Sequence, residues 1–65
     1  MVGIKNNLRV QQTRNQLKQA LLTLLADHSL ANITVTTICQ VADINRGTFY
    51  SHYGSPAALF ADIEH

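Results

Sequence analysis

NRGTFYSHY, at residues 45–53, combines two kinds of side chain at helical spacing. Phe49 and Tyr53 lie four positions apart, so a helix would point both of them to the same side, into a core. The other side chains include a guanidinium, hydroxyls and an imidazole, which would point away from that core. The segment therefore predicts a short helix with an apolar back and a front of hydrogen-bonding groups, suited to contact with a polar partner.

A second apolar stripe precedes this segment and is separated from it by one short turn. Its apolar positions follow the spacing i, i+3, i+4 and i+7: Val35, Ile38, Cys39 and Ala42. Thr34 is the expected N-cap of this helix, and Asn45 is the expected N-cap of the next one, at about residues 46–53. Between them, Asp43 can adopt the left-handed backbone that a tight turn requires. Two helices in this order are typical of a helix-turn-helix, whose second helix reads DNA.

The first helix is predicted at about residues 13–28. Thr13 and Gln16 match a capping box, and leucines at helical spacing follow: Leu17, Leu21, Leu24 and Leu25. Residues 1–12 are polar without a sustained period, so we expect a flexible basic arm there. Leu30 and Ile33 are expected to fold back onto the core.

A fourth helix is predicted after Gly54, the expected stop of helix 46–53. Ser55 would be its N-cap and Pro56 its first residue. Its apolar stripe is still in phase where the chain ends: Leu59, Phe60 and Ile63. We therefore expect this helix to continue past His65. The predicted fold class is all-α, a small helical bundle with a helix-turn-helix, made of three helices and the start of a fourth.

Size and composition predict one small domain. The chain has 65 residues, of which 46% are hydrophobic and 14% charged, which argues against disorder. No apolar run approaches the roughly 20 residues that span a bilayer, and the N-terminus lacks the order of a secretory signal. The single cysteine, Cys39, excludes an intramolecular disulfide and is expected to be a small buried residue. A cytoplasmic location is the resulting expectation.

Charge placement is more informative than the net charge of +1. Four of the five cations lie in the first 18 residues: Lys5, Arg9, Arg14 and Lys18. The fifth, Arg46, opens the second helix of the pair. Three of the four acids lie well away from both places in the sequence: Asp27, Asp62 and Glu64. This asymmetry suits an anionic partner, although a solvated N-terminal tail would have the same composition.

Several of these motifs occur together in one known family. The strings Ile33-Thr34-Val35, Ile38-Cys39, residues 42–50 (ADINRGTFY) and His52-Tyr53 resemble the N-terminal domain of TetR-type regulators. The resemblance covers about residues 13–64. It implies a sequence-specific DNA-binding domain of a transcriptional regulator, a repressor, that binds a double-stranded DNA operator. It also implies a larger C-terminal domain, absent from this chain, that forms the homodimer and binds a small-molecule effector.

The resemblance assigns DNA contacts to particular positions. They lie along the second helix of the pair and at the start of the first: Thr34, Thr36, Asn45, Arg46, Gly47, Thr48, Tyr50, Ser51 and His52. Gly47 would let the backbone approach a phosphate or a base edge. Tyr50 would stack on a thymine methyl or donate to a phosphate, and His52 would donate to a phosphate. For Arg46, a guanine and a phosphate are both open as targets.

The chain departs from the family pattern at two positions. Pro56 stands where family members usually place a lysine that holds a phosphate, so we expect weaker binding or a shift to the backbone N–H groups of the fourth helix. Asp43 stands where a glycine is usual, and we expect little effect because aspartate tolerates the left-handed backbone.

Two other classes of function differ in how well the sequence supports them. The same scaffold could serve as a small helical protein-interaction module that has lost DNA binding. An enzyme is disfavoured because no acid–base pair, nucleophile or metal cluster converges. Asp62 and Glu64 lie two positions apart and do not share a helix face. We therefore expect no catalytic residues, no metal site and no cofactor.

Overall fold

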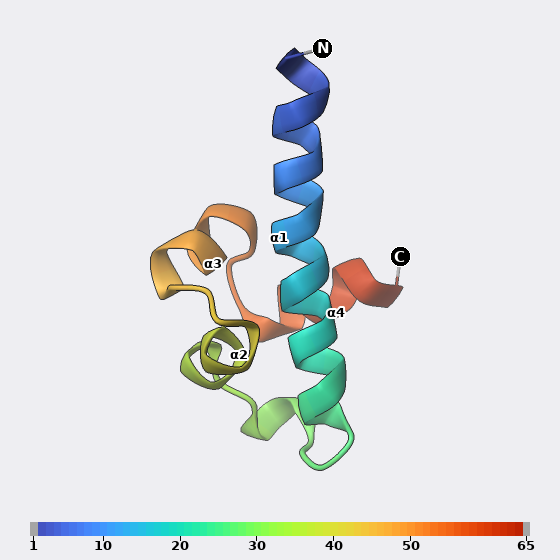
Figure 1. Ribbon diagram of the computed structural model, residues 1–65. Coiled ribbons are helices and arrows are strands. Elements are labelled where there is room, and N and C mark those ends of the chain that lie inside the picture. The colour runs from blue at the N-terminus through green and yellow to red at the C-terminus, as the bar shows by residue number, and fades with distance from the viewer. Residues whose placement is uncertain (1, 65) are drawn as a thin grey trace.

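The computed structural model describes the backbone of residues 2–64 and the side chains of residues 8–64. In this part of the chain all regular structure is helical. The elements are α1 (Val2–Leu25), the short 3-10 helix η1 (Leu30–Asn32), α2 (Val35–Ala42), α3 (Arg46–His52) and α4 (Pro56–Glu64). Figure 1 shows α1 as a long central rod, with α2 and α3 along one side of it and its N-terminal half projecting past the other helices. The predicted all-α bundle with a helix-turn-helix is confirmed.

The first helix is longer at its N-terminal end than the sequence pattern predicts. It begins at Val2 instead of Thr13, so residues 2–12 are helical where the sequence pattern predicts no helix, and the flexibility expected of this arm stays a prediction. Thr13 is not an N-cap: its hydroxyl donates to the carbonyl of Arg9 at 3.1 Å, as a threonine within a helix does. The prediction followed the apolar stripe, whereas the helix begins well before the first core residue of that stripe, Leu17.

The same helix ends earlier than expected, at Leu25 instead of His28. The N–H of Ala26 donates to Thr23 at 3.3 Å and that of Asp27 to Leu24 at 3.1 Å, which is the tighter i→i+3 pattern of a closing turn. The chain then passes through η1 and returns to the bundle. Ile33 is buried and Leu30 packs against the core, as predicted.

The core lies where α1 meets the other three helices. Its buried residues are Leu17, Ala20, Leu21, Leu24, Ile33, Ile38, Cys39, Phe49, Tyr53 and Leu59. The partly buried apolar residues packed on it include Val35, Ala42, Ile44, Phe60 and Ile63. The predicted inward positions of all four helices are therefore confirmed, including the burial of Cys39. Within residues 2–64 no helix has the length and apolarity to cross a bilayer.

The turn between α2 and α3 has the geometry that the sequence predicts. Asp43 adopts the left-handed conformation, with φ 59° and ψ 45°. The N–H of Ile44 donates to the carbonyl of Cys39 at 3.0 Å, which closes the end of α2. Thr34 caps α2, because its hydroxyl accepts a hydrogen bond from the N–H of Thr37 at 3.1 Å. Local side-chain chemistry thus sets both ends of α2.

The end of α3 differs from the prediction. Gly54 directly follows the C-cap Tyr53, as a helix stop does, but within the described residues no glycine has a positive φ, so it does not adopt the left-handed conformation common at that position. The chain leaves the helix one residue earlier, at Tyr53, which is extended with φ −140° and ψ 146°. The N–H of Tyr53 still donates to the carbonyl of Phe49 at 2.9 Å, so this residue closes the helix while its ring packs in the core. Ser55 then caps α4 as predicted: its hydroxyl accepts the N–H of Ala58 at 3.1 Å.

Candidate nucleic-acid interface

α3 is held with one side against the bundle and the other toward solvent. Phe49 is fully buried (0% exposed), whereas its neighbour Tyr50 is 58% exposed. Tyr53, which follows the helix, is buried at 9% exposure. The prediction that Phe49 and Tyr53 belong to the core and that Tyr50 lies on the surface is confirmed.

All nine residues predicted to contact DNA are at the surface to some degree. Seven are exposed, namely Thr34, Thr36, Asn45, Arg46, Gly47, Tyr50 and Ser51, and Thr48 and His52 are half-buried. None of the nine belongs to the core. Their roles as DNA contacts stay predictions, but each side chain has access to a partner.

Three of these side chains also form hydrogen bonds within the protein. The Asn45 side-chain oxygen accepts a hydrogen bond from the N–H of Thr48 at 2.8 Å and so caps α3. The Thr34 hydroxyl caps α2 and lies 2.9 Å from the Thr37 hydroxyl. The Ser51 hydroxyl donates to the carbonyl of Gly47 at 3.0 Å. A partner would therefore meet the amide nitrogen of Asn45 and an acceptor lone pair of Ser51.

Gly47 has a structural role that the sequence pattern did not indicate. A Cβ atom at this position would lie 3.3 Å from the side-chain oxygen of Asn45, closer than most Cβ contacts. The missing side chain therefore leaves room for the cap of α3. This room is needed whether or not the backbone of Gly47 approaches DNA.

A shallow, open hollow of about 600 Å³ lies between α2 and α3 of the helix-turn-helix. Its walls are Thr36, Cys39, Gln40, Asp43, Ile44, Asn45 and Arg46. The fold thus brings Thr36 of α2 together with Asn45 and Arg46 at the start of α3. Tyr50, Ser51 and His52 do not line this hollow and lie farther along α3.

Gln40 is a candidate that the sequence prediction missed. It is exposed and lines the hollow beside Arg46. Its position one helical turn after Thr36 places both on the same side of α2, and this spacing was the available signal. Arg46 also lies near Cys39: burial raises the pKa of the Cys39 thiol, and the Arg46 charge opposes that rise.

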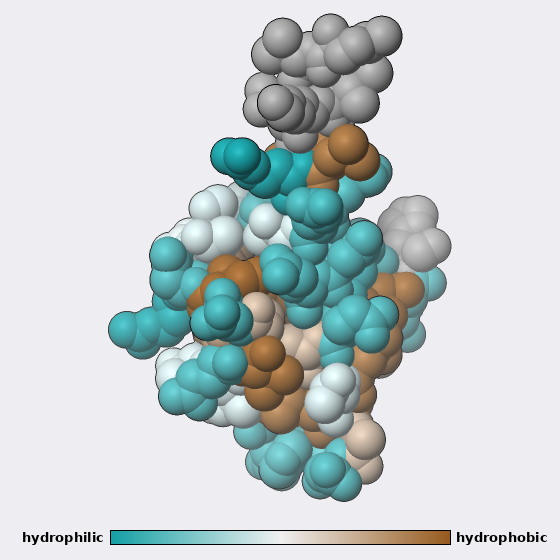
Figure 2. All heavy atoms as spheres, viewed as in Figure 1, coloured by the Kyte–Doolittle hydropathy of each residue, from teal (hydrophilic) through white to brown (hydrophobic). Residues whose placement is uncertain are grey.

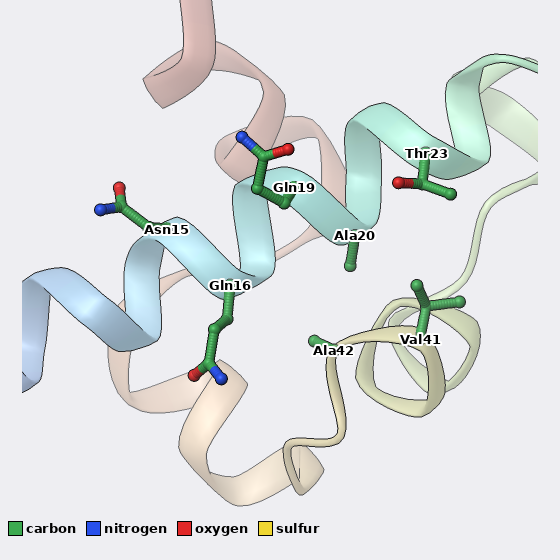
Figure 3. Close-up of a pocket in the computed structure, with 7 residues that line it drawn as sticks. All are labelled: Asn15, Gln16, Gln19, Ala20, Thr23, Val41 and Ala42. Atoms are coloured by element: carbon green, nitrogen blue, oxygen red, sulfur yellow. The ribbon is translucent and has the colours of Figure 1, made fainter.

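A second hollow, of 370 Å³, lies between α1 and α2 (Figure 3). It is lined by Asn15, Gln16, Gln19, Ala20, Thr23, Val41 and Ala42. In Figure 3 the side chains of Ala20 and Gln16 point toward α2 and the turn that follows it. None of the nine predicted contact residues lines this hollow, so it is separate from the candidate interface.

One acid lies closer to a cation than its sequence position suggested. Asp62 lies 3.4 Å from Lys18, so the expectation that this acid stands apart from the N-terminal cations is wrong. The packing of α4 on α1 brings the two together. Asp43 lines the same hollow as Arg46. The visible face of the molecule is mostly hydrophilic, with hydrophobic areas scattered over it (Figure 2).

The described residues hold no group of three or more histidine, cysteine, aspartate or glutamate side chains arranged to bind a metal ion. The chemistry on this surface is that of hydroxyls, amides, one guanidinium and one imidazole. These groups form hydrogen bonds to phosphates and to base edges.

Comparison with known proteins identifies the family. Residues 18–63 match the family described as bacterial regulatory proteins, tetR family. The chain belongs to the tetR family. The match includes α2, α3 and the turn between them, so the helix-turn-helix is the regulatory, DNA-binding type of domain found in that family.

One relative supports the same assignment. The chain is 40% identical over 52 residues to the uncharacterized HTH-type transcriptional regulator YxbF of Bacillus subtilis (strain 168). The aligned region covers 78% of this tetR-family chain and 14% of the relative. The chain therefore spans about a seventh of the length of that relative. No solved structure matches the chain.

Proposed function

We propose that this chain is the DNA-reading domain of a transcriptional repressor, and that α3 lies in the major groove of a double-stranded operator. The observation that carries the proposal is the division of α3 into a buried side at Phe49 and an open side at Gly47, Tyr50 and Ser51. A helix anchored on one side and polar on the other is what a groove requires.

The contacts fall into two proposed groups. Thr34, Thr36 and His52 would contact phosphates and so fix the position of the domain on the duplex. Arg46 and Tyr50 lie four positions apart on one flank of α3 and would read base edges. Gln40, one turn from Thr36 and beside Arg46, would add an amide to the same hollow. Thr48 and the amide nitrogen of Asn45 would provide further DNA contacts at the start of α3.

Dimerisation and effector binding are part of the proposal. The domain would act in a homodimer, with two half-sites about one helical turn of DNA apart. The dimer interface and the small-molecule site would lie in a C-terminal domain, as the greater length of the YxbF relative suggests. A regulator of this kind works where the genome is, in the cytoplasm.

The decisive experiment measures binding to DNA by fluorescence anisotropy. The probe is a labelled random-sequence duplex, titrated with the protein over a salt series. For a DNA-binding domain the logarithm of the affinity must fall linearly with the logarithm of the salt concentration, with a slope set by the number of phosphates contacted. Binding without a salt slope, or no binding at low salt, would contradict the proposal.

A protein-interaction module is the second candidate. The observation that favours it is the hollow between α1 and α2, beside which Val41 is 48% exposed. Such a module need not bind the random duplex at all, so the same titration separates the two candidates.

A further inference from the structure

A single carboxylate joins the end of α3 to two other helices. The hydroxyl of Tyr53, which directly follows α3, donates a hydrogen bond to Oδ2 of Asp62 in α4 at 2.5 Å. The same oxygen lies 3.4 Å from Nζ of Lys18 in α1. Side chains from α1, from α4 and from the residue that follows α3 therefore meet at one atom.

α3 depends on such an anchor because it is short. It has seven residues, about two turns, and only Phe49 within it is buried. Its N-terminal end is fixed to α2 by the turn and by the Asn45 cap. Its C-terminal end is fixed by Tyr53, whose ring centroid lies 6.0 Å from that of Phe49. A rod this short keeps its direction only if both ends are held.

The Tyr53 hydroxyl adds little to core packing, and its main contribution is one directional hydrogen bond. A phenylalanine ring would fill the same place in the core, and the hydroxyl adds one directional bond to that packing. The protonation states of the two groups suit this bond: the Tyr53 hydroxyl keeps its proton and the Asp62 carboxyl is ionised. Burial and the hydrogen bond to Asp62 raise the pKa of Tyr53 to about 12. The hydrogen bond from Tyr53, followed by the contact with Lys18, lowers the pKa of Asp62.

We infer that Asp62 is a positioning residue for DNA reading: it holds the C-terminal end of α3 through the Tyr53 hydroxyl, and thereby sets the direction in which Tyr50 and Ser51 face the groove. The inference rests on the proposed function of α3. Asp62 would act through Tyr53 and not by contact with DNA, because its carboxylate is turned to Tyr53 and Lys18.

The test compares sequence discrimination with stability. A duplex is first selected from a random-sequence pool with the wild-type protein. Affinity for that duplex and for a scrambled duplex of the same composition is then measured for Tyr53→Phe, Asp62→Ala and Asp62→Asn. Losing one positioning hydrogen bond should lower the ratio of the two affinities roughly two- to tenfold in Tyr53→Phe and Asp62→Ala. Asp62→Asn keeps an acceptor oxygen and should retain most of the ratio.

Two controls separate positioning from simple loss of stability. Leu30→Ala removes a partly buried side chain in η1, far from α3 in the sequence, and should lower the melting temperature without changing the ratio. In the double variant Tyr53→Phe with Asp62→Ala, the ratio of the two affinities should fall no further than in either single variant, because both substitutions remove the same hydrogen bond.

Each outcome has one meaning. Unchanged discrimination in Tyr53→Phe and Asp62→Ala overturns the inference and leaves the proposed function intact. An equal loss in Leu30→Ala also overturns it, since the cause is then stability. If the wild-type protein selects no duplex and shows no salt-dependent binding, the proposed function fails and the inference fails with it.

Discussion

The rings of Phe49 and Tyr50, neighbours in α3, meet edge to face with centroids 5.6 Å apart and planes at 87°. One ring is 0% exposed and the other is 58% exposed. This pair marks the border of α3 between the side that holds the domain together and the side that can meet a partner. Substitutions at the two positions should therefore separate folding from binding.

Phe49→Ala should unfold the domain. The substitution removes the largest fully buried side chain and leaves a cavity, at a cost of about 3–5 kcal/mol. A chain of this size has a total stability of only about 3–10 kcal/mol. Circular dichroism with thermal unfolding measures the effect, and Phe49→Leu, which keeps most of the volume, should remain folded. A folded Phe49→Ala protein with an unchanged melting temperature would contradict the assigned core.

Tyr50→Ala and Arg46→Ala should weaken DNA binding and lower the melting temperature far less than Phe49→Ala does, although Tyr50→Ala also removes the edge-to-face contact with Phe49. Each side chain is exposed, and no hydrogen bond within residues 8–64 engages either one. Loss of a base contact should cost about 1–3 kcal/mol in affinity for a duplex selected from a random pool. Anisotropy titrations over a salt series measure this. If Tyr50→Ala bound as tightly as the wild type at every salt concentration, the reading face would be wrongly assigned.

Asn45 offers a matched pair of substitutions. Asn45→Ala removes the acceptor for the Thr48 N–H and should cost about 1 kcal/mol of stability. Asn45→Asp keeps the acceptor and adds a negative charge at the N-terminus of α3, so stability should hold while DNA repels the new charge. Urea unfolding and anisotropy measure the two effects. Equal DNA affinity for Asn45→Asp and the wild type would show that this end of α3 does not face phosphates.

Pro56 leaves the start of α4 with few N–H groups that could donate a hydrogen bond to a phosphate. Proline has no N–H, and the N–H groups of Ala58 and Leu59 already donate to Ser55, each at 3.1 Å. Pro56→Lys should therefore add a phosphate contact and steepen the slope of log affinity against log salt by about 1. Ala61→Lys adds the same charge at an exposed site farther along α4 and serves as the control. A slope that rises equally in both variants would mean that only net charge matters.

Alkaline pH should destabilise the domain through Tyr53. Its pKa is raised to about 12 in the folded chain, first by burial and then by the hydrogen bond to Asp62. In the unfolded chain a tyrosine titrates near its usual value of about 10. Between these values the unfolded chain has lost a proton that the folded chain keeps, so the free energy of unfolding should fall as pH rises. Urea unfolding of the wild type and Tyr53→Phe across this window measures the effect, and the variant should show the flatter dependence.

The caps and the turn were readable from the sequence because each depends on neighbours. Thr34, Asn45 and Ser55 each accept a backbone N–H three residues ahead. The left-handed turn at Asp43 is set by the tolerance of its own side chain for that backbone. The inward positions at Phe49 and Tyr53 follow from helical spacing. Such short-range chemistry is the same in a peptide and in a fold, so a single sequence is enough to predict it.

Other features needed the assembled bundle. α3 ends at His52 and Tyr53 is extended, which the helical spacing of Phe49 and Tyr53 did not indicate, and Gly54 does not adopt the left-handed conformation. The hollow that joins Thr36, Gln40 and Arg46 exists only once α2 and α3 cross. The start of α1 was misplaced because the prediction followed the apolar stripe, whereas the helix begins well before the first core residue of that stripe, Leu17.

The amino-acid order alone determined that the chain forms a helix-turn-helix and which side chains of α3 can face outward, because spacing and capping act over a few residues. Only the tertiary structure decided how α3 is aimed. Its direction depends on Asp62 of α4, which accepts a hydrogen bond from Tyr53 and contacts Lys18 of α1, a helix far from α4 in the chain. Such contacts arise from how the helices pack, and no local pattern of residues encodes them.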